Sequence, residues 1–188
     1  CFWSRSSGLV TVNEGHRDRV GTVEWSHAGD AVATGGNDGS MRLWNSDGTP
    51  RASLKGHEFP VTDLAWHPSG LTLVSIDSAE NMIHWNAQGE QLEQRQSAAG
   101  EVPSAIAWAP DGQSYCVAGN GREIEHVVVG DNTLNSIDGH DLRLNDLEWN
   151  AAGNSFATAG ADGIIRVFIR NARPALFIKT EVAARSLA

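Results

Sequence analysis

Seven tryptophans fall into two series of constant spacing, and no other feature of the chain restricts its fold as strongly. The first series steps by 41, 42 and 41 residues through Trp25, Trp66, Trp108 and Trp149. The second steps by 41 and 41 through Trp3, Trp44 and Trp85, and a further 83 residues reach Phe168. Gly-His dipeptides keep the same period, at Gly15-His16, Gly56-His57 and Gly139-His140. Three markers in one register indicate a structural unit of about 41 residues that is repeated along the chain.

Within each repeat, short apolar or alternating runs are separated by turn residues, and this pattern predicts strands. In the first repeat the runs cover Val20–Trp25, Ala31–Thr34 and Met41–Trp44, with a weaker fourth run at Arg51–Leu54. The dipeptide Asp38-Gly39 before the third run is a strong hairpin signal. Because no window keeps a helical period for the ten or so residues that a helix needs, each repeat is predicted to be a four-stranded antiparallel meander.

These markers occur in a fixed order that resembles the WD40 repeat. A Gly-His dipeptide precedes a strand that ends in Trp, and an Asp-Gly turn precedes another strand that ends in Trp. The resemblance covers almost the whole chain and implies a β-propeller, in which four-stranded sheets called blades pack radially around a channel. One departure is that Trp44-Asn45 and Trp85-Asn86 carry an amide where the family has the acid of its Trp-Asp pair.

We predict an all-β fold, a WD40 β-propeller in the form of an open arc of four complete four-stranded blades with partial blades at both ends. Such an arc is a fragment of a larger, seven-bladed propeller. The expected boundaries are 1–14 for the first partial blade, 15–55, 56–96, 97–138 and 139–179 for blades one to four, and 180–188 for the start of the next blade. A complete four-bladed ring is the alternative, and it leaves the half-blades at the two ends unexplained.

The resemblance also implies a chain of hydrogen bonds inside each blade. It runs from the Gly-His histidine through a Ser or Thr on the second strand and the turn Asp to the third-strand Trp. A buried carboxylate needs such pairing, and a neutral imidazole can both donate and accept. Blade one has a residue for every position, namely His16, Thr34, Asp38 and Trp44. Blade four has His140, Thr158 and Asp162, but its Phe168 has no N–H to donate.

The hydrogen-bonded chain is expected to be incomplete in the other two blades. Blade two supplies His57, Ser75 and Trp85, with Ala79 at the position of the turn Asp. Asp77 lies two residues too early, and we do not expect it to substitute. Blade three has Val117, Gly121 and Val127 at the corresponding positions. The cohesion of the blades should therefore decline from blade one through blades four and two to blade three.

Catalytic and metal-binding interpretations are weaker than structural ones. His16, Asp38 and Thr34 have the residue types of a catalytic triad, but the set partly recurs about every 41 residues, which blade closure requires and catalysis does not. The spacing of a calcium-binding loop is absent around the acidic residues Asp131, Asp138 and Asp141. We therefore expect no catalytic residue, no cofactor and no bound metal.

The composition is that of a folded globular protein, and it argues against two classes of partner. Of the 188 residues, 40% are hydrophobic and 20% are charged. Acidic residues outnumber basic ones 23 to 14, and a net charge of -9 argues against binding a phosphate backbone. No apolar run reaches the roughly 18 residues that span a bilayer. We expect no direct nucleic-acid binding and no membrane association.

Two classes of function remain. The first is a non-catalytic scaffold that mediates protein–protein interactions, which the WD40 resemblance implies. The second is a propeller enzyme, which would need carboxylates or histidines that converge on the channel from several inner strands, or an active site in blades that this chain lacks. No such set occurs at the inner-strand positions Gly21, Thr62, Ser104 and Asn145. The scaffold is therefore favoured.

The candidate partner-binding face is the end of the blades where the loop after each Gly-His and the Asp turn come together. Three blades contribute to it Arg17, Asp18, Arg19, Glu58, Phe59, Asp141, Leu142 and Arg143. An exposed aromatic residue beside arginine is typical of interface hot spots. The alternative is that Phe59 folds back onto Pro60 and the edge of the blade.

Several segments are also similar, in the same order, to the WD-repeat subunits of the THO complex. They are Val23–Ser26, Leu64–Pro68, Ala107–Gly112 and Leu144–Asn150, followed by Ile165–Phe168 and Arg173-Pro174. This similarity implies that the partners are other protein subunits of a multiprotein complex in mRNA processing and export, and that the protein is nuclear. A WD40 scaffold of another intracellular complex is the alternative.

Overall fold

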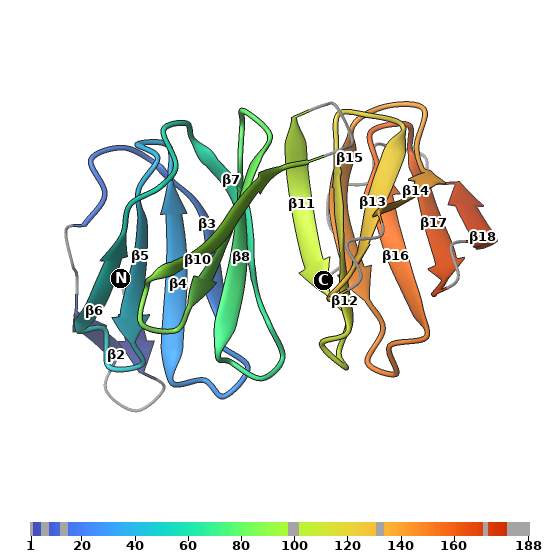
Figure 1. Cartoon of the computed structure of the whole chain (residues 1–188). Coiled ribbons are helices and arrows are strands. Elements are labelled where there is room, and N and C mark those ends of the chain that lie inside the picture. The colour runs from blue at the N-terminus through green and yellow to red at the C-terminus, as the bar shows by residue number, and fades with distance from the viewer. Residues whose placement is uncertain are drawn as a thin grey trace.

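The computed structural model of the chain describes residues 2–4, 8–11, 15–97, 102–130, 134–170 and 173–179. The regular secondary structure of these residues consists of β-strands, in four antiparallel four-stranded sheets and one two-stranded sheet (Figure 1). The predicted all-β fold with four-stranded blades is therefore confirmed. None of the described segments forms a helix with the length and apolarity that crossing a bilayer requires.

Each four-stranded sheet is a meander of consecutive strands. Blade one consists of β3 (Val20–Trp25), β4 (Ala31–Gly36), β5 (Met41–Asn45) and β6 (Pro50–Leu54). Blade two consists of β7 (Val61–Trp66), β8 (Thr72–Asp77), β9 (Asn81–Asn86) and β10 (Gln91–Gln96). Blade three consists of β11 (Pro103–Trp108), β12 (Ser114–Gly119), β13 (Glu123–Val128) and β14 (Leu134–Asp138). Blade four consists of β15 (Leu144–Trp149), β16 (Ser155–Gly160), β17 (Ile164–Ile169) and β18 (Arg173–Lys179).

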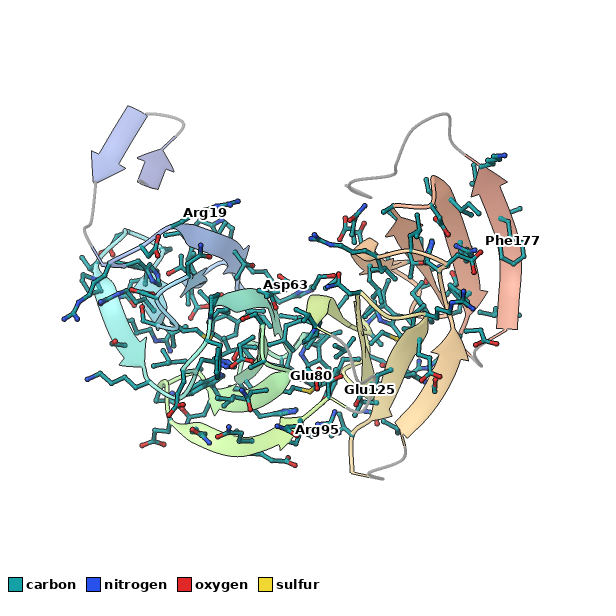
Figure 2. All side chains as sticks on the ribbon, turned by 90° about the horizontal axis from the view of Figure 1, so that it is seen from above. Arg19, Asp63, Glu80, Arg95, Glu125 and Phe177 are labelled. Atoms are coloured by element: carbon teal, nitrogen blue, oxygen red, sulfur yellow. The ribbon has the colours of Figure 1, made fainter. Side chains whose placement is uncertain are left out.

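The four blades stand side by side in an open arc (Figure 2). Their first strands, β3, β7, β11 and β15, pack against one another in that order along the inner side. In Figure 2, Asp63 of β7 lies on the inner side of the arc and Arg95 of β10 on the outer side. Before blade one, β1 (Phe2–Ser4) and β2 (Gly8–Thr11) pair as a separate two-stranded sheet. Residues 180–188, where a further blade was expected to begin, lie outside the described residues.

A β-bulge lies near the start of every inner strand, and in blades two and three it directs a hydroxyl toward the next blade. The pairing register shifts at the same place in all four strands, and the extra residues are Gly21, Thr62, Ser104 and Asn145. The Thr62 hydroxyl donates to the Pro103 carbonyl at 2.9 Å. One blade further on, the Ser104 hydroxyl donates to the Leu144 carbonyl at 2.7 Å. Since a bulge re-aims a side chain, these two hydroxyls connect neighbouring blades.

The hydrophobic core lies between the blades. Met41, Leu43 and Leu54 of blade one pack with Leu64 and Trp66 of blade two. Equivalent clusters join blade two to blade three and blade three to blade four. Burial of apolar surface stabilises a fold by about 25 cal/mol per Å². Each blade therefore depends on its neighbours to cover its two apolar faces.

The face of blade one that points away from blade two is not covered in this way. Val23 is 64% exposed and Trp25 is 51% exposed, whereas their equivalents in blade two, Leu64 and Trp66, are 3% and 5% exposed. An apolar patch of this kind on the face of a sheet favours association.

We expect the isolated chain of 188 residues to self-associate through this face. Replacing Val23 and Trp25 together by serine should shift the population toward the monomer, because it removes the apolar surface that association would cover. Sedimentation velocity measures the distribution of species. Leu71→Ser is the matched control, because Leu71 is also exposed but lies in the turn between β7 and β8. A monodisperse monomer before any substitution would contradict this interpretation.

Candidate functional site

The Gly-His histidine of blade one precedes β3, and its ring reaches β4 and the turn between β4 and β5. His16 Nε2 lies 2.8 Å from the Thr34 hydroxyl oxygen, and Trp44 Nε1 donates to the same oxygen at 3.0 Å. On the other side of the ring, His16 Nδ1 lies 3.0 Å from the Ser40 hydroxyl and 3.4 Å from Asp38 Oδ1. The four residues expected from the repeat thus lie in one connected polar group.

Asp38 is held mainly by main-chain and hydroxyl donors. Its Oδ2 accepts from the Arg17 N–H at 2.8 Å, and its Oδ1 accepts from the N–H and hydroxyl of Ser40 at 3.1 and 2.7 Å. Burial acts to raise the pKa of Asp38, but these hydrogen bonds and the one with His16 hold the pKa below its usual range. Asp38 therefore ties the loop after Gly-His to the β4–β5 turn.

Blade two completes the same chain with a different carboxylate. His57 Nδ1 lies 2.7 Å from Asp77 Oδ2, and His57 Nε2 lies 2.6 Å from the Ser75 hydroxyl oxygen. Trp85 Nε1 donates to that hydroxyl oxygen at 2.8 Å. The expectation that Asp77 does not substitute for the missing turn Asp is wrong. Blade two was ranked below blade four in cohesion because it lacks the turn Asp. That reason no longer holds, since Asp77 completes the hydrogen-bonded chain and both Asp77 and Ser75 are fully buried.

The partners of His57 determine its tautomer. A carboxylate can only accept, so Nδ1 carries the hydrogen and donates to Asp77. Nε2 then accepts from the Ser75 hydroxyl, whose oxygen accepts from Trp85. Burial lowers the pKa of His57 and outweighs the opposite effect of Asp77. The imidazole is therefore neutral at pH 7 and relays hydrogen bonds from the indole to the carboxylate.

A glycine at the end of the second strand decides which carboxylate a blade can use. Asp77 occupies the repeat position of Gly36 and Gly160. A Cβ on Gly36 would overlap Asp38 Oδ1 and would lie 2.5 Å from His16 Nδ1. A side chain is therefore excluded there while the turn Asp is present, and blade two has Asp77 together with Ala79. The sequence carried this signal in blade two, where the glycine and the turn Asp are replaced together.

We expect the two arrangements to be exchangeable in blade one. Asp38→Ala should lower the free energy of unfolding by about 1–3 kcal/mol, because His16 and Ser40 lose their acceptor. Adding Gly36→Asp to Asp38→Ala should recover about half of this loss, because the new carboxylate reaches His16 from the position of Asp77.

Denaturant titration of the full-length protein measures these changes. Gly36→Asp alone is the control and should destabilise, since two carboxylates then compete for one space. Additive effects of the two substitutions would show that the positions do not share a site.

Blade four keeps the histidine, the hydroxyl and the turn Asp. His140 Nδ1 lies 2.9 Å from Asp162 Oδ1, and His140 Nε2 lies 2.7 Å from the Thr158 hydroxyl oxygen. Arg166 donates to Asp162 Oδ2 at 2.7 Å. Burial acts to raise the pKa of Asp162, but the hydrogen bonds from Arg166 and His140 lower it to about 2. An arginine of the third strand thus adds a charged partner that the sequence analysis did not anticipate.

Apolar side chains replace the missing members of the chain. Phe168 of blade four is fully buried and stacks on Phe156, with ring centroids 5.0 Å apart. In blade three, Val117 and Val127 are buried in the cluster that joins blades two and three. These positions keep their packing role while the hydrogen bonds are lost.

A polar cluster on the outer side of the arc connects blades two and three (Figure 2). Arg95 donates to the Tyr115 hydroxyl at 2.6 Å and lies 3.5 Å from a Glu125 oxygen. The Ser97 hydroxyl donates to Glu125 at 2.7 Å, and His84 Nε2 lies 3.0 Å from the Tyr115 hydroxyl. Sequence analysis missed this cluster because its residues do not recur with the repeat.

Two carboxylates of the inner strands link neighbouring blades. Asp63 of β7 accepts from the Thr22 hydroxyl of β3 and from the Ile106 N–H of β11, both at 3.0 Å, and so joins three blades. Glu24 of β3 accepts from the Trp66 N–H of β7 at 2.8 Å. Sequence analysis considered only the four bulge positions for inner-strand carboxylates and missed both residues.

These carboxylates have the raised pKa values that also occur in general acids. Burial raises the pKa of Glu24 to about 8 and that of Asp63 to about 6, and outweighs the hydrogen bonds from the main chain. Both side chains line a cleft of about 400 Å³. Each is nevertheless engaged by an N–H of the next blade. Among the described residues, no three side chains of the metal-binding types come together. The arrangement is that of a structural link between blades.

The raised pKa of Glu24 makes stability depend on pH. The folded state binds a proton that the unfolded state releases between the ordinary value of 4.5 and about 8, so the contribution of Glu24 is complete below pH 4.5 and is lost as the pH rises to about 8. Glu24→Gln should remove this loss, and the variant should gain stability relative to the unmodified protein over that interval. Denaturant titrations from pH 4.5 to 8.5 measure the difference, and a constant difference would contradict the assignment.

The candidate partner-binding face lies in the loops that precede the inner strands. All eight of its residues are exposed, and its two apolar members, Phe59 and Leu142, are 47% and 55% exposed. The loops are fixed at their bases, because the Arg17 N–H binds Asp38 and the backbone at Gly39 lies against the carbonyl oxygens of His57 and Phe59. Exposed apolar side chains thus stand on an ordered main chain.

Comparison with protein families matches the chain to the WD40 family, described as "WD domain, G-beta repeat", over residues 7–45, 48–84 and 131–168. These stretches cover more than half of the chain. The chain belongs to the WD40 family. The gap between the second and third matches contains most of blade three, the WD40 blade in which the hydrogen-bonded chain is missing. Proteins of the WD40 family serve as scaffolds for protein interactions.

Two curated relatives are similar to most of this WD40 chain. SIR4-interacting protein SIF2 of Saccharomyces cerevisiae is 24% identical over 180 residues, which cover 88% of this chain and 32% of the relative. THO complex subunit 3 of Arabidopsis thaliana is 28% identical over 162 residues, which cover 82% of this chain and 50% of the relative. The chain therefore spans half or less of the length of these relatives.

Proposed function

We propose that this WD40 chain is a non-catalytic scaffold that holds other protein subunits in a multiprotein complex, through the loops at one end of its blades. The observation that carries the proposal is the exposure of Phe59 and Leu142 beside charged residues on anchored loops. An apolar side chain on an ordered loop loses little conformational entropy on binding, which favours affinity. The full face is the set Arg17, Asp18, Arg19, Glu58, Phe59, Asp141, Leu142 and Arg143.

The proposed complex is the THO complex, which acts in mRNA processing and export, and the proposed location is the nucleus. The ordered similarity of four inner-strand segments to its WD-repeat subunits supports this proposal, as does the 28% identity to THO complex subunit 3. The other relative, SIF2, is named for its interaction with SIR4, which is also a protein interaction. We also propose that the chain divides into four blades with a partial blade before and after them.

Affinity purification of the tagged full-length protein from its own cells tests the proposal. We expect subunits of the THO complex among the proteins that co-purify. Phe59→Ala combined with Leu142→Ala should reduce their recovery about tenfold, because truncation of interface anchors typically costs more than 1 kcal/mol each. The melting temperature should stay nearly unchanged, since both side chains are exposed.

The matched control is Leu71→Ala combined with Leu92→Ala, which removes two exposed leucines outside the loop face. Equal losses in both double variants would place the binding surface elsewhere. A defined set of partners without THO subunits would contradict the assignment to that complex and leave the scaffold function intact.

A further inference from the structure

The residues just before the four inner strands lie at the loop end of the inner side of the arc, where a propeller has the entrance to its channel. Each of their carbonyl oxygens accepts a hydrogen bond from the loop that follows the second strand of the same blade. The pairs are Arg19 with Asn37 at 2.8 Å, Pro60 with Ser78 at 3.0 Å, Val102 with Asn120 at 3.1 Å, and Arg143 with Ala161 at 2.8 Å. Because this bond recurs in every blade, the main chain of the entrance is fixed and its side chains vary.

A cleft of about 310 Å³ lies at this entrance. Blades one and four line it with Arg19 and Arg143, and blades two and three line it with Pro60 and Val102. The side chains of Asn37 and Asn120 add two amides. No carboxylate belongs to the described lining, although acidic residues outnumber basic ones 23 to 14 in the chain.

Both arginines of the cleft are exposed, and neither guanidinium forms an ion pair within the described parts of the chain. The carboxylate next to Arg19 in sequence, Asp18, accepts a hydrogen bond from the Arg19 main-chain N–H at 2.6 Å. Two unpaired guanidinium groups that share one cleft attract anions, and their planar donors match carboxylates in a bidentate manner.

We propose that this cleft binds an extended acidic peptide segment of a partner protein. Two carboxylates of the segment pair with Arg19 and Arg143, and an apolar side chain between them packs on Pro60 and Val102. The amides of Asn37 and Asn120 both donate and accept, as the main chain of an extended peptide requires. This proposal rests on the scaffold function and specifies the chemistry of the partner.

A nucleic acid is the less suitable ligand. Phosphate-backbone binding needs several basic groups along a surface, whereas this cleft has two arginines in a chain of net charge -9. The apolar surface between the arginines also has no counterpart in a phosphate backbone. It fits a side chain such as leucine.

Fluorescence anisotropy with the full-length protein and three labelled probes tests the proposal. The first probe is a short peptide with the core Glu-Ser-Leu-Ser-Glu, in which Glu, Leu and Glu share one face of an extended chain. The second is the same peptide with Gln in place of Glu, and the third is a single-stranded oligouridylate of similar length. We expect the Glu peptide to bind at least about tenfold more tightly than the Gln peptide, since each charge-assisted pair adds to the affinity. Arg19→Gln and Arg143→Gln should each weaken binding of the Glu peptide about fivefold.

Arg122→Gln is the matched control, because Arg122 is an exposed arginine of the turn between β12 and β13 that neither lines the cleft nor belongs to the partner-binding face. It should leave the affinity unchanged. Equal binding of the Glu and Gln peptides, binding of the oligouridylate alone, or binding of no probe would each overturn the proposal. If the co-purified partners still depend on Phe59 and Leu142 in that case, the scaffold function stands without it.

Discussion

Each four-stranded sheet in this protein has two apolar faces, and a sheet of that kind is stable only between two neighbours. The clusters that bury Leu64, Tyr115 and Phe156 all lie between blades, so the core is a series of interfaces. The inner-strand bulges, the hydroxyls of Thr62 and Ser104 and the carboxylates of Glu24 and Asp63 act at the same interfaces. Polar links at the inner edge therefore align sheets that apolar contacts hold together.

Within a blade, the hydrogen-bonded chain has a different task. It joins the loop before the inner strand to the turn after the second strand, at the end where Arg19 and Phe59 are exposed. The same contacts that close the blade thus give the loop face an ordered base. In blade three, valines replace side chains of the hydrogen-bonded chain, but the Asn120 N–H still donates to the Val102 carbonyl. Main-chain pairing preserves the channel entrance even where the side chains have diverged.

The repeat made the fold and much of the polar chain predictable, because fixed spacing turns one well-formed blade into a template for the others. The prediction for Asp77 was wrong because an alignment of the repeats compares one position at a time. The space around the Gly-His histidine is shared by two positions, the end of the second strand and the turn Asp. The cluster of Arg95, Tyr115 and Glu125 could not be predicted from the sequence for another reason. Their contacts depend on how two blades pack, and residues that occur once leave no periodic signal.

The shared space at Gly36 has a consequence for how such repeats diverge. A blade with glycine and the turn Asp, and a blade with Asp77 and Ala79, are both complete. The intermediates between them either crowd two carboxylates together or leave the histidine without an acceptor. Gene duplication can copy either solution, but single substitutions convert one into the other only through a less stable protein. A blade therefore tends to keep the arrangement that it inherits, because the two positions must change together. Shared arrangements can then indicate which repeats descend from a common copy.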